Sequence, residues 1–210
     1  MSDLRVALTF DAEHPDRPAG DAVAEAIVEI LGREDVPATF FVQGRWASAY
    51  PEIARRIGAA GHLIGNHSHA HAPLTRFTED GILADIAEAE SDISEATGLD
   101  PRPWFRCPFG DGVDDLVVLR AISLAGYTHA GWDIDAMDWE SGRTASSLEA
   151  DVVTAVLERG GDSVVLLHTW PEATAGALAG IIGRLRDRGA AFVRLDALAD
   201  VPVGAGEAAG

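Results

Sequence analysis

The chain has 210 residues, of which 47% are hydrophobic, so it is long and apolar enough to bury the core of one domain. Sixteen basic residues, all arginine, stand against thirty-four acidic ones, and the formal charge of −18 disfavours binding to nucleic acids and to anionic membrane surfaces. The single cysteine, Cys107, excludes an intrachain disulfide, and no apolar run is long enough to span a membrane.

In chain order, the sequence predicts strands that alternate with helices. Apolar runs typical of buried strands occupy 5–10, 38–42, 63–64, 127–132, 163–168 and 191–195, and a proline-punctuated extended stretch occupies 101–110. Apolar residues at helical spacing occupy 21–33, 46–60, 79–97, 113–125, 145–159 and 173–188. This alternation predicts an α/β fold: a distorted (β/α) barrel of about seven parallel strands in one domain, 1–201, followed by a flexible tail, 202–210.

Polar side chains interrupt the apolar pattern where the predicted strands end. In barrel-like α/β proteins, functional groups collect at the C-terminal ends of the strands. Residues of this kind are Asp11, His67, His71, Arg106, Asp135, Asp138 and His168. We therefore expect one pocket to hold them all.

His67 and His71 are four residues apart, directly after a glycine-punctuated predicted strand. On one helical turn both imidazoles would face the same way and reach one transition metal at about 2.0–2.2 Å. A His-rich loop without metal gives the same pattern, because a short motif is weak evidence without its structural context.

Five short motifs follow one another between residues 5 and 195. They are Thr9-Phe10-Asp11, His67-Ser68-His69-Ala70-His71, Arg106-Cys107-Pro108-Phe109-Gly110, Asp135-Ala136-Met137-Asp138-Trp139 and Leu166-Leu167-His168. In this order they resemble the motifs of the NodB-homology polysaccharide deacetylases, also called carbohydrate esterase family 4. Each motif is weak alone, but five in register are specific. The resemblance implies a barrel of NodB-homology type that hydrolyses N-acetyl groups.

The resemblance also implies the roles of the polar residues. Asp11 is expected to be the general base, oriented by Arg106, and His168 the general acid, with its imidazolium favoured by Asp138. A divalent metal, expected to be zinc, would bind to His67 and His71 together with a carboxylate; it would polarise the acetamide carbonyl and activate a water molecule.

The remaining aromatic, histidine and cysteine side chains are assigned less directly. Apolar walls for the substrate are expected from Phe109, Trp132 and Trp139. His62, His69 and His129 match no function of the family and are expected to be structural. Cys107 has no partner and is expected to be a packed thiol rather than a nucleophile.

The sequence departs from the family pattern at the metal carboxylate. The family's second aspartate aligns with Ala12, which cannot bind a metal, and its glycine aligns with Glu13. Glu13 is one residue further on and one methylene longer, so it is the first candidate for the third ligand, next to His67 and His71. Ligation by Asp11, participation of His14 and absence of a functional metal are the alternatives.

The predicted function is a metal-dependent amide hydrolase that removes N-acetyl groups from an amino sugar, an oligosaccharide or a polysaccharide. A metal-independent hydrolase of cyclic amides or ureides, as in the allantoinase-like relatives, is one alternative, and a catalytically lapsed sugar-binding barrel is another. The expected partner is a small-molecule or oligosaccharide substrate, with neither nucleic acid nor membrane. No signal-like segment begins the chain, which favours a cytoplasmic address, although a trimmed export signal would leave the same sequence.

Overall fold

The computed structural model describes residues 4–17, 21–204 and 207–208. Its strands all pair in parallel in one sheet with the order β5-β4-β3-β2-β1-β7-β6-β9, and β8 pairs with β1 outside this path. The strands are β1 (Arg5–Ala12), β2 (Thr39–Val42), β3 (Leu63–Asn66), β4 (Trp104–Phe105), β5 (Thr128–His129), β6 (Ile134–Asp135), β7 (Asp162–His168), β8 (Ala191–Phe192) and β9 (Glu207–Ala208).

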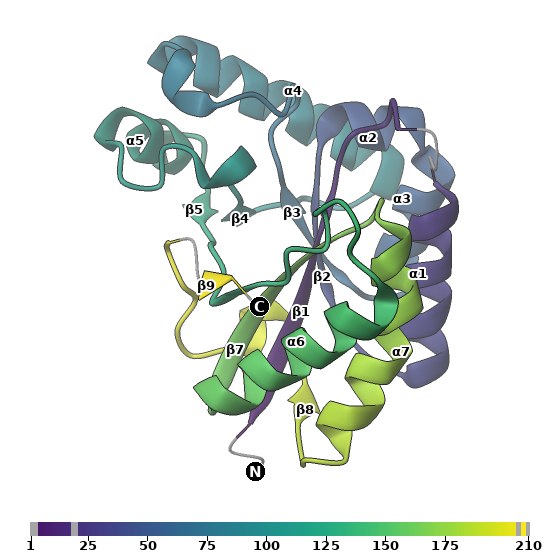
Figure 1. The fold of residues 1–210 in the computed structure, drawn as a ribbon. Coiled ribbons are helices and arrows are strands. Elements are labelled where there is room, and N and C mark those ends of the chain that lie inside the picture. The colour runs from purple at the N-terminus through teal and green to yellow at the C-terminus, as the bar shows by residue number, and fades with distance from the viewer. Residues whose placement is uncertain (1–3, 18–20, 205–206, 209–210) are drawn as a thin grey trace.

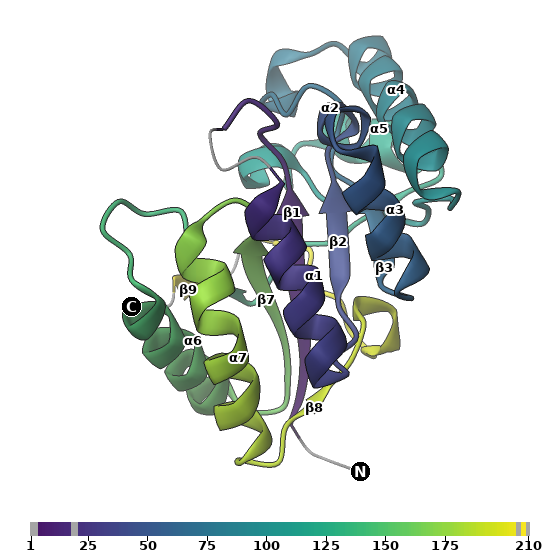
Figure 2. The ribbon, with the colours of Figure 1, turned by 90° about the vertical axis from the view of Figure 1, so that its right-hand side faces the viewer.

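Helices cover the outer face of this sheet. Figure 2 shows α1, α6 and α7 packed across it, and Figure 1 shows α4 and α5 over the β4–β5 end. The helices are α1 (Ala22–Glu34), α2 (Gly44–Ala49), α3 (Pro51–Ala59), α4 (Glu79–Thr97), α5 (Leu116–Leu124), α6 (Ala145–Arg159) and α7 (Glu172–Arg186), with short 3₁₀ turns η1 (Leu74–Arg76), η2 (Pro108–Gly110) and η3 (Leu195–Ala197). The predicted distorted (β/α) barrel is confirmed, and among the described residues no pairing joins β5 to β9 to close it.

The central strand β1 separates two cores. Its residues Val6, Leu8, Phe10 and Ala12 pack in the large cluster under the helices, whereas Ala7 packs in the cluster inside the curled sheet. This alternation is the two-residue period of a strand, and it places Asp11 on the inner face. Ala12 is fully buried among apolar residues on the other face.

Two helices that have capping side chains also have the bounds predicted from the sequence. The helices predicted at 79–97 and 145–159 have those bounds in the structure, where the side chains of Thr78 and Thr144 accept capping hydrogen bonds. The single helix predicted over 46–60 is wrong: the chain forms α2 and α3 with a break at Tyr50. Pro51 explains the break, because proline is accepted in the first turn of a helix but not in its interior.

The end of the chain lies against the sheet. The carbonyls of Pro202 and Gly204 accept hydrogen bonds from Gly131 (2.6 Å) and Trp132 (3.1 Å), and β9 pairs with β6. A Cβ on Gly131 would lie 2.0 Å from the Gly204 carbonyl oxygen, so only glycine allows this approach. Of the predicted tail, residues 205, 206, 209 and 210 lie outside the described residues, and its flexibility stays a prediction. No helix among the described residues combines the length and the apolar character needed to cross a bilayer.

Candidate functional site

The ends of five strands bring the polar residues together. β1 and β7 are neighbours in register, so Asp11 lies directly beside His168. His67 follows β3, Arg106 follows β4 and Asp135 ends β6. The expectation that Asp135 and Asp138 follow the strand at 127–132 is wrong, since an additional strand, β6, carries Asp135 and leads to Asp138.

Glu13, His67 and His71 form a compact cluster. One ligand atom from each lies within 4.8 Å of the others, and the three side chains are at most 5% exposed. Glu13 Oε2 contacts His71 Nε2 closely and lies 3.3 Å from His67 Nε2. Glu13 reaches this position because it follows Asp11 by two residues and returns to the same face of the strand. The two imidazoles and one carboxylate are therefore arranged as a metal-binding set.

The helical turn expected for His67 and His71 is wrong. Residues 67–71 form a loop, in which Ser68 (φ 62°) and His71 (φ 53°) adopt left-handed backbone conformations. Polar side chains stabilise the loop: Asp85 on α4 accepts from the backbone N–H groups of His69 and Ala70 at 2.9 and 3.0 Å. The two rings still converge, with centroids 4.9 Å apart.

The His67 ring is oriented for binding through Nε2. Its Nδ1 lies 2.9 Å from the Arg106 carbonyl oxygen, which can only accept, so Nδ1 carries the proton. Nε2 is then the unprotonated atom of the neutral ring; it is buried and has no hydrogen-bond partner. Burial lowers the pKa of His67, but the carboxylates of Asp11 and Glu13 outweigh burial and raise it above its usual value. A buried nitrogen facing two carboxylates fits a cation at this point.

The second carboxylate oxygen of Glu13 is held from the other side. Trp170 Nε1 donates to Glu13 Oε1 at 3.1 Å, and His14 Nε2 lies 3.1 Å from the same oxygen. Burial would raise the pKa of Glu13, but the surrounding imidazoles of His14, His67 and His71 hold it well below its usual value. Glu13 is therefore an ionised carboxylate in an oriented position.

Asp11 is fixed by a buried arginine. Arg106 Nη1 donates to Asp11 Oδ1 and to Thr9 Oγ1, both at 2.9 Å, and the remaining guanidinium donors bond the carbonyls of Ala130 and Gly131. The guanidinium is fully buried and stacks on the ring of Phe41. Asp11 Oδ2 is left 3.5 Å from His67 Nε2, so this oxygen faces the cluster.

His168 is held by Asp138. Its Nδ1 lies 2.7 Å from Asp138 Oδ1, and its backbone N–H and the Thr174 hydroxyl donate to Asp138 Oδ2 at 2.7 and 2.6 Å. Burial alone would lower the pKa of His168, but Asp138 above all, and then Glu13 and Asp11, raise it to about 10. His168 is therefore protonated at neutral pH, with Nε2 on the side of Glu13, 4.0 Å from Oε1.

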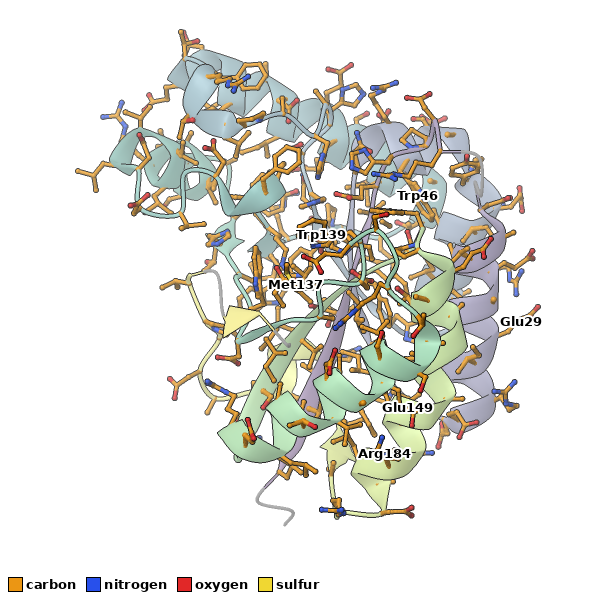
Figure 3. All side chains as sticks on the ribbon, in the orientation of Figure 1. Glu29, Trp46, Met137, Trp139, Glu149 and Arg184 are labelled. Atoms are coloured by element: carbon orange, nitrogen blue, oxygen red, sulfur yellow. The ribbon has the colours of Figure 1, made fainter. Side chains whose placement is uncertain are left out.

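A pocket of about 450 Å³ opens over these groups. The three aromatic residues expected in its wall are all there: Phe109 and Trp139 are 64% and 46% exposed, whereas Trp132 is buried. Figure 3 labels Trp139 in the segment between β6 and α6, in the middle of the view. Cys107 also lines the pocket, but burial raises the pKa of its thiol to about 12, so it is not a thiolate at neutral pH.

Sequence reasoning missed two residues of the pocket, Arg17 and Trp170. Trp170 follows the end of β7 by two residues, which was the available signal, whereas Arg17 lies in a polar loop without any motif. His62 and His129 lie outside the cluster, and burial lowers the pKa of each to about 4, so both are neutral. His69 faces Glu88 and Asp92 on α4 instead of the pocket.

Comparison with known proteins adds a family and several relatives. Residues 1–130 match the family model described as polysaccharide deacetylase. A peptidoglycan-N-acetylglucosamine deacetylase of Bacillus cereus is 31% identical over 197 residues, which cover 92% of this chain and 67% of that protein. A chitooligosaccharide deacetylase of Sinorhizobium fredii is 31% identical over 197 residues, covering 88% and 86%. A peptidoglycan-N-acetylmuramic acid deacetylase of Bacillus subtilis is 28% identical over 194 residues, covering 92% and 70%.

Solved structures share the fold. A family 4 carbohydrate esterase from Streptomyces lividans, in complex with acetate, aligns with a TM-score of 0.79 at 26% identity, over 93% of this chain and 94% of its own. A family 4 carbohydrate esterase pseudoenzyme from Bacillus anthracis aligns with a TM-score of 0.82 at 26% identity, over 94% of this chain and 66% of its own. Some relatives are longer than the matched region: this chain spans 59% of the length of one from Bacillus subtilis.

Proposed function

This chain belongs to the polysaccharide deacetylase family, hydrolases of carbon–nitrogen bonds other than peptide bonds, and from that premise we propose that it removes N-acetyl groups from an amino sugar or an oligosaccharide in a metal-dependent reaction. One observation carries the proposal. Glu13, His67 and His71 share one pocket with a carboxylate fixed by Arg106 and an imidazolium fixed by Asp138.

Glu13, His67 and His71 are the residues that we propose to hold the metal. Two imidazoles and one carboxylate are a donor set typical of catalytic zinc sites, so zinc is the proposed ion. The backbone carbonyl of Arg106 on His67 and the indole of Trp170 on Glu13 are the outer partners that such ligands require. When bound, a divalent ion supplies Lewis acidity toward the amide carbonyl and lowers the pKa of a water molecule.

Proton transfer is assigned to Asp11 and His168. The free oxygen of Asp11 accepts a proton from the attacking water as the water oxygen bonds to the acetyl carbon. His168 Nε2 then donates a proton to the amine nitrogen as the carbon–nitrogen bond breaks, which gives acetate and the free amine. Arg106 and Asp138 do not touch the substrate in this scheme; they orient the base and the acid.

Acetate release from chitooligosaccharides and N-acetyl monosaccharides, by protein purified without chelator, tests the proposal. Asp11→Asn and His168→Ala should each lower kcat about 10²–10⁴-fold, since each removes a positioned proton-transfer group. His69→Ala, outside the pocket, is the matched control and should keep wild-type turnover. Either site variant with near-normal kcat would remove that residue from the mechanism.

The same experiment separates the alternatives. Turnover of a cyclic amide or ureide that survives a chelator would favour the metal-independent hydrolase. Sugar binding without any hydrolysis would favour the lapsed barrel, for which the alanine at position 12 and the likeness to a pseudoenzyme are the supporting observations.

A further inference from the structure

Arg17 lies in the pocket wall without a carboxylate partner among the described residues. In that part of the chain, every arginine except Arg17, Arg76 and Arg188 forms an ion pair. Of these three, Arg17 is the one that lines the pocket. With thirty-four acidic residues against sixteen arginines, partners are abundant, so a cation without one at this place requires an explanation.

The guanidinium of Arg17 stacks with its flat face on the ring of Trp170. Its Cζ lies 3.4 Å from the centroid of the Trp170 ring, a cation–π stack, and the Arg17 backbone N–H donates to the His14 carbonyl at 3.1 Å. Stacking engages the flat face of the guanidinium and leaves its in-plane N–H donors free. Because a guanidinium presents these donors as a planar fork, it matches the two oxygens of a carboxylate.

This stack stands beside the proposed reacting groups. The Trp170 ring centroid is 5.9 Å from that of His168, and the indole N–H is the donor to Glu13 Oε1. Neutralising Glu13 does not explain Arg17, because no ion pair joins these two described residues and both Glu13 oxygens already have partners in His14, His71 and Trp170. The Arg17 donors are therefore available to a molecule in the pocket.

We propose that Arg17 is a specificity-determining residue that binds a carboxylate on the substrate, so that the site prefers an acid-bearing N-acetylated sugar chain over a neutral one. The preference in hydrolysis rests on the proposed function, whereas the binding of a carboxylate by Arg17 does not. The pocket wall carries Asp11, Glu13 and Asp135, which repel an anionic ligand, and its other cation, the imidazolium of His168, is already paired with Asp138. Arg17 supplies that cation at the rim, where it is exposed to an incoming ligand.

The test compares two tetrasaccharides of equal length. One is neutral tetra-N-acetylchitotetraose; in the other, alternate sugars are N-acetylmuramic acid, which carries a lactyl carboxylate. Both Kd, by calorimetry, and kcat/KM, by acetate release, are measured for wild type, Arg17→Gln and Arg17→Lys. Arg188→Gln is the matched control, since it removes the same charge from an exposed arginine outside the pocket.

Wild type should bind the acidic chain more tightly, and Arg17→Gln should weaken that chain about 10–100-fold while leaving the neutral one unchanged, as expected for loss of a charge-assisted hydrogen-bonded pair. Arg17→Lys should keep part of the preference, and Arg188→Gln all of it. Equal binding of both chains by wild type, an equal loss for both in Arg17→Gln, or no binding of either would overturn the proposal. If neither chain is hydrolysed, the proposed function fails, and the Kd values still decide the role of Arg17.

Discussion

Ala12 and Glu13 face opposite sides of the sheet because β1 keeps its alternation to its last residue. Ala12 packs in the core under the helices, and Glu13 returns to the side of Asp11. The shift of the carboxylate by one position, visible in the sequence, thus has a geometric reason. The contact of Glu13 with Trp170 was not predictable, because no local pattern indicates a contact between residues 157 positions apart.

Removal of the Trp170 indole N–H should loosen the Glu13 carboxylate. Trp170→Phe keeps an aromatic face for Arg17 but deletes the 3.1 Å hydrogen bond to Oε1. Loss of an outer partner of a metal ligand commonly weakens the metal about 10–100-fold. Calorimetric zinc titration should show this loss with unchanged stoichiometry, and wild-type affinity would mean that Glu13 is oriented without Trp170.

The pH profile should report the coupling of Asp138 to His168. A general acid must be protonated, so activity is lost as pH rises past its pKa, here about 10. Asp138→Asn removes the main charge that raises this pKa, so the alkaline limb of kcat/KM should move to lower pH. An alkaline limb that stays in place would assign the acid to another group.

At the scale of elements, the bounds of two capped helices and the ends of the strands were predictable from the sequence. The left-handed backbone conformations were not. The strand-end rule correctly predicted that Asp11, His67 and His168 line one pocket, but Arg106 and Asp138, which were expected there too, are buried beside it and bond Asp11 and His168. The helical turn predicted at 67–71 was wrong because Asp85, on α4, accepts hydrogen bonds from the backbone between the two left-handed residues of this loop. Such tertiary support leaves no mark in the local spacing.

Replacement of Gly44 and of Gly32 by alanine should have opposite effects on the stability of the protein. In α2, a Cβ on Gly44 would meet Ala89 Cα at 2.8 Å and His69 at 2.9 Å, where α2 lies against α4 (Figure 2). Gly44→Ala should therefore cost about 1–3 kcal/mol. Gly32 in α1 has open space around it, so Gly32→Ala should stabilise by about 0.5–1 kcal/mol. Urea midpoints measure both, and a Gly44→Ala variant as stable as wild type would show that the two helices are not closely packed.

At the scale of the whole molecule, the order of the β and α elements predicted the barrel, but one end of its sheet was not predictable. β6 and β9 are two residues each, too short for any periodicity, and β9 pairs through a contact that spans more than seventy residues. Although the formal charge of the chain is −18, an exposed arginine, Arg17, lines the pocket.

Zinc titration of protein stripped of metal tests the central claim, that Glu13 replaces the missing aspartate, most directly. Wild type should bind one equivalent, and His69→Gln, a histidine of the same loop outside the pocket, should behave as wild type. Glu13→Gln keeps the shape of the side chain but loses its charge, so zinc should weaken by more than the roughly 10–100-fold expected for an outer partner. A Glu13→Gln variant that binds one equivalent with unchanged affinity would contradict the claim.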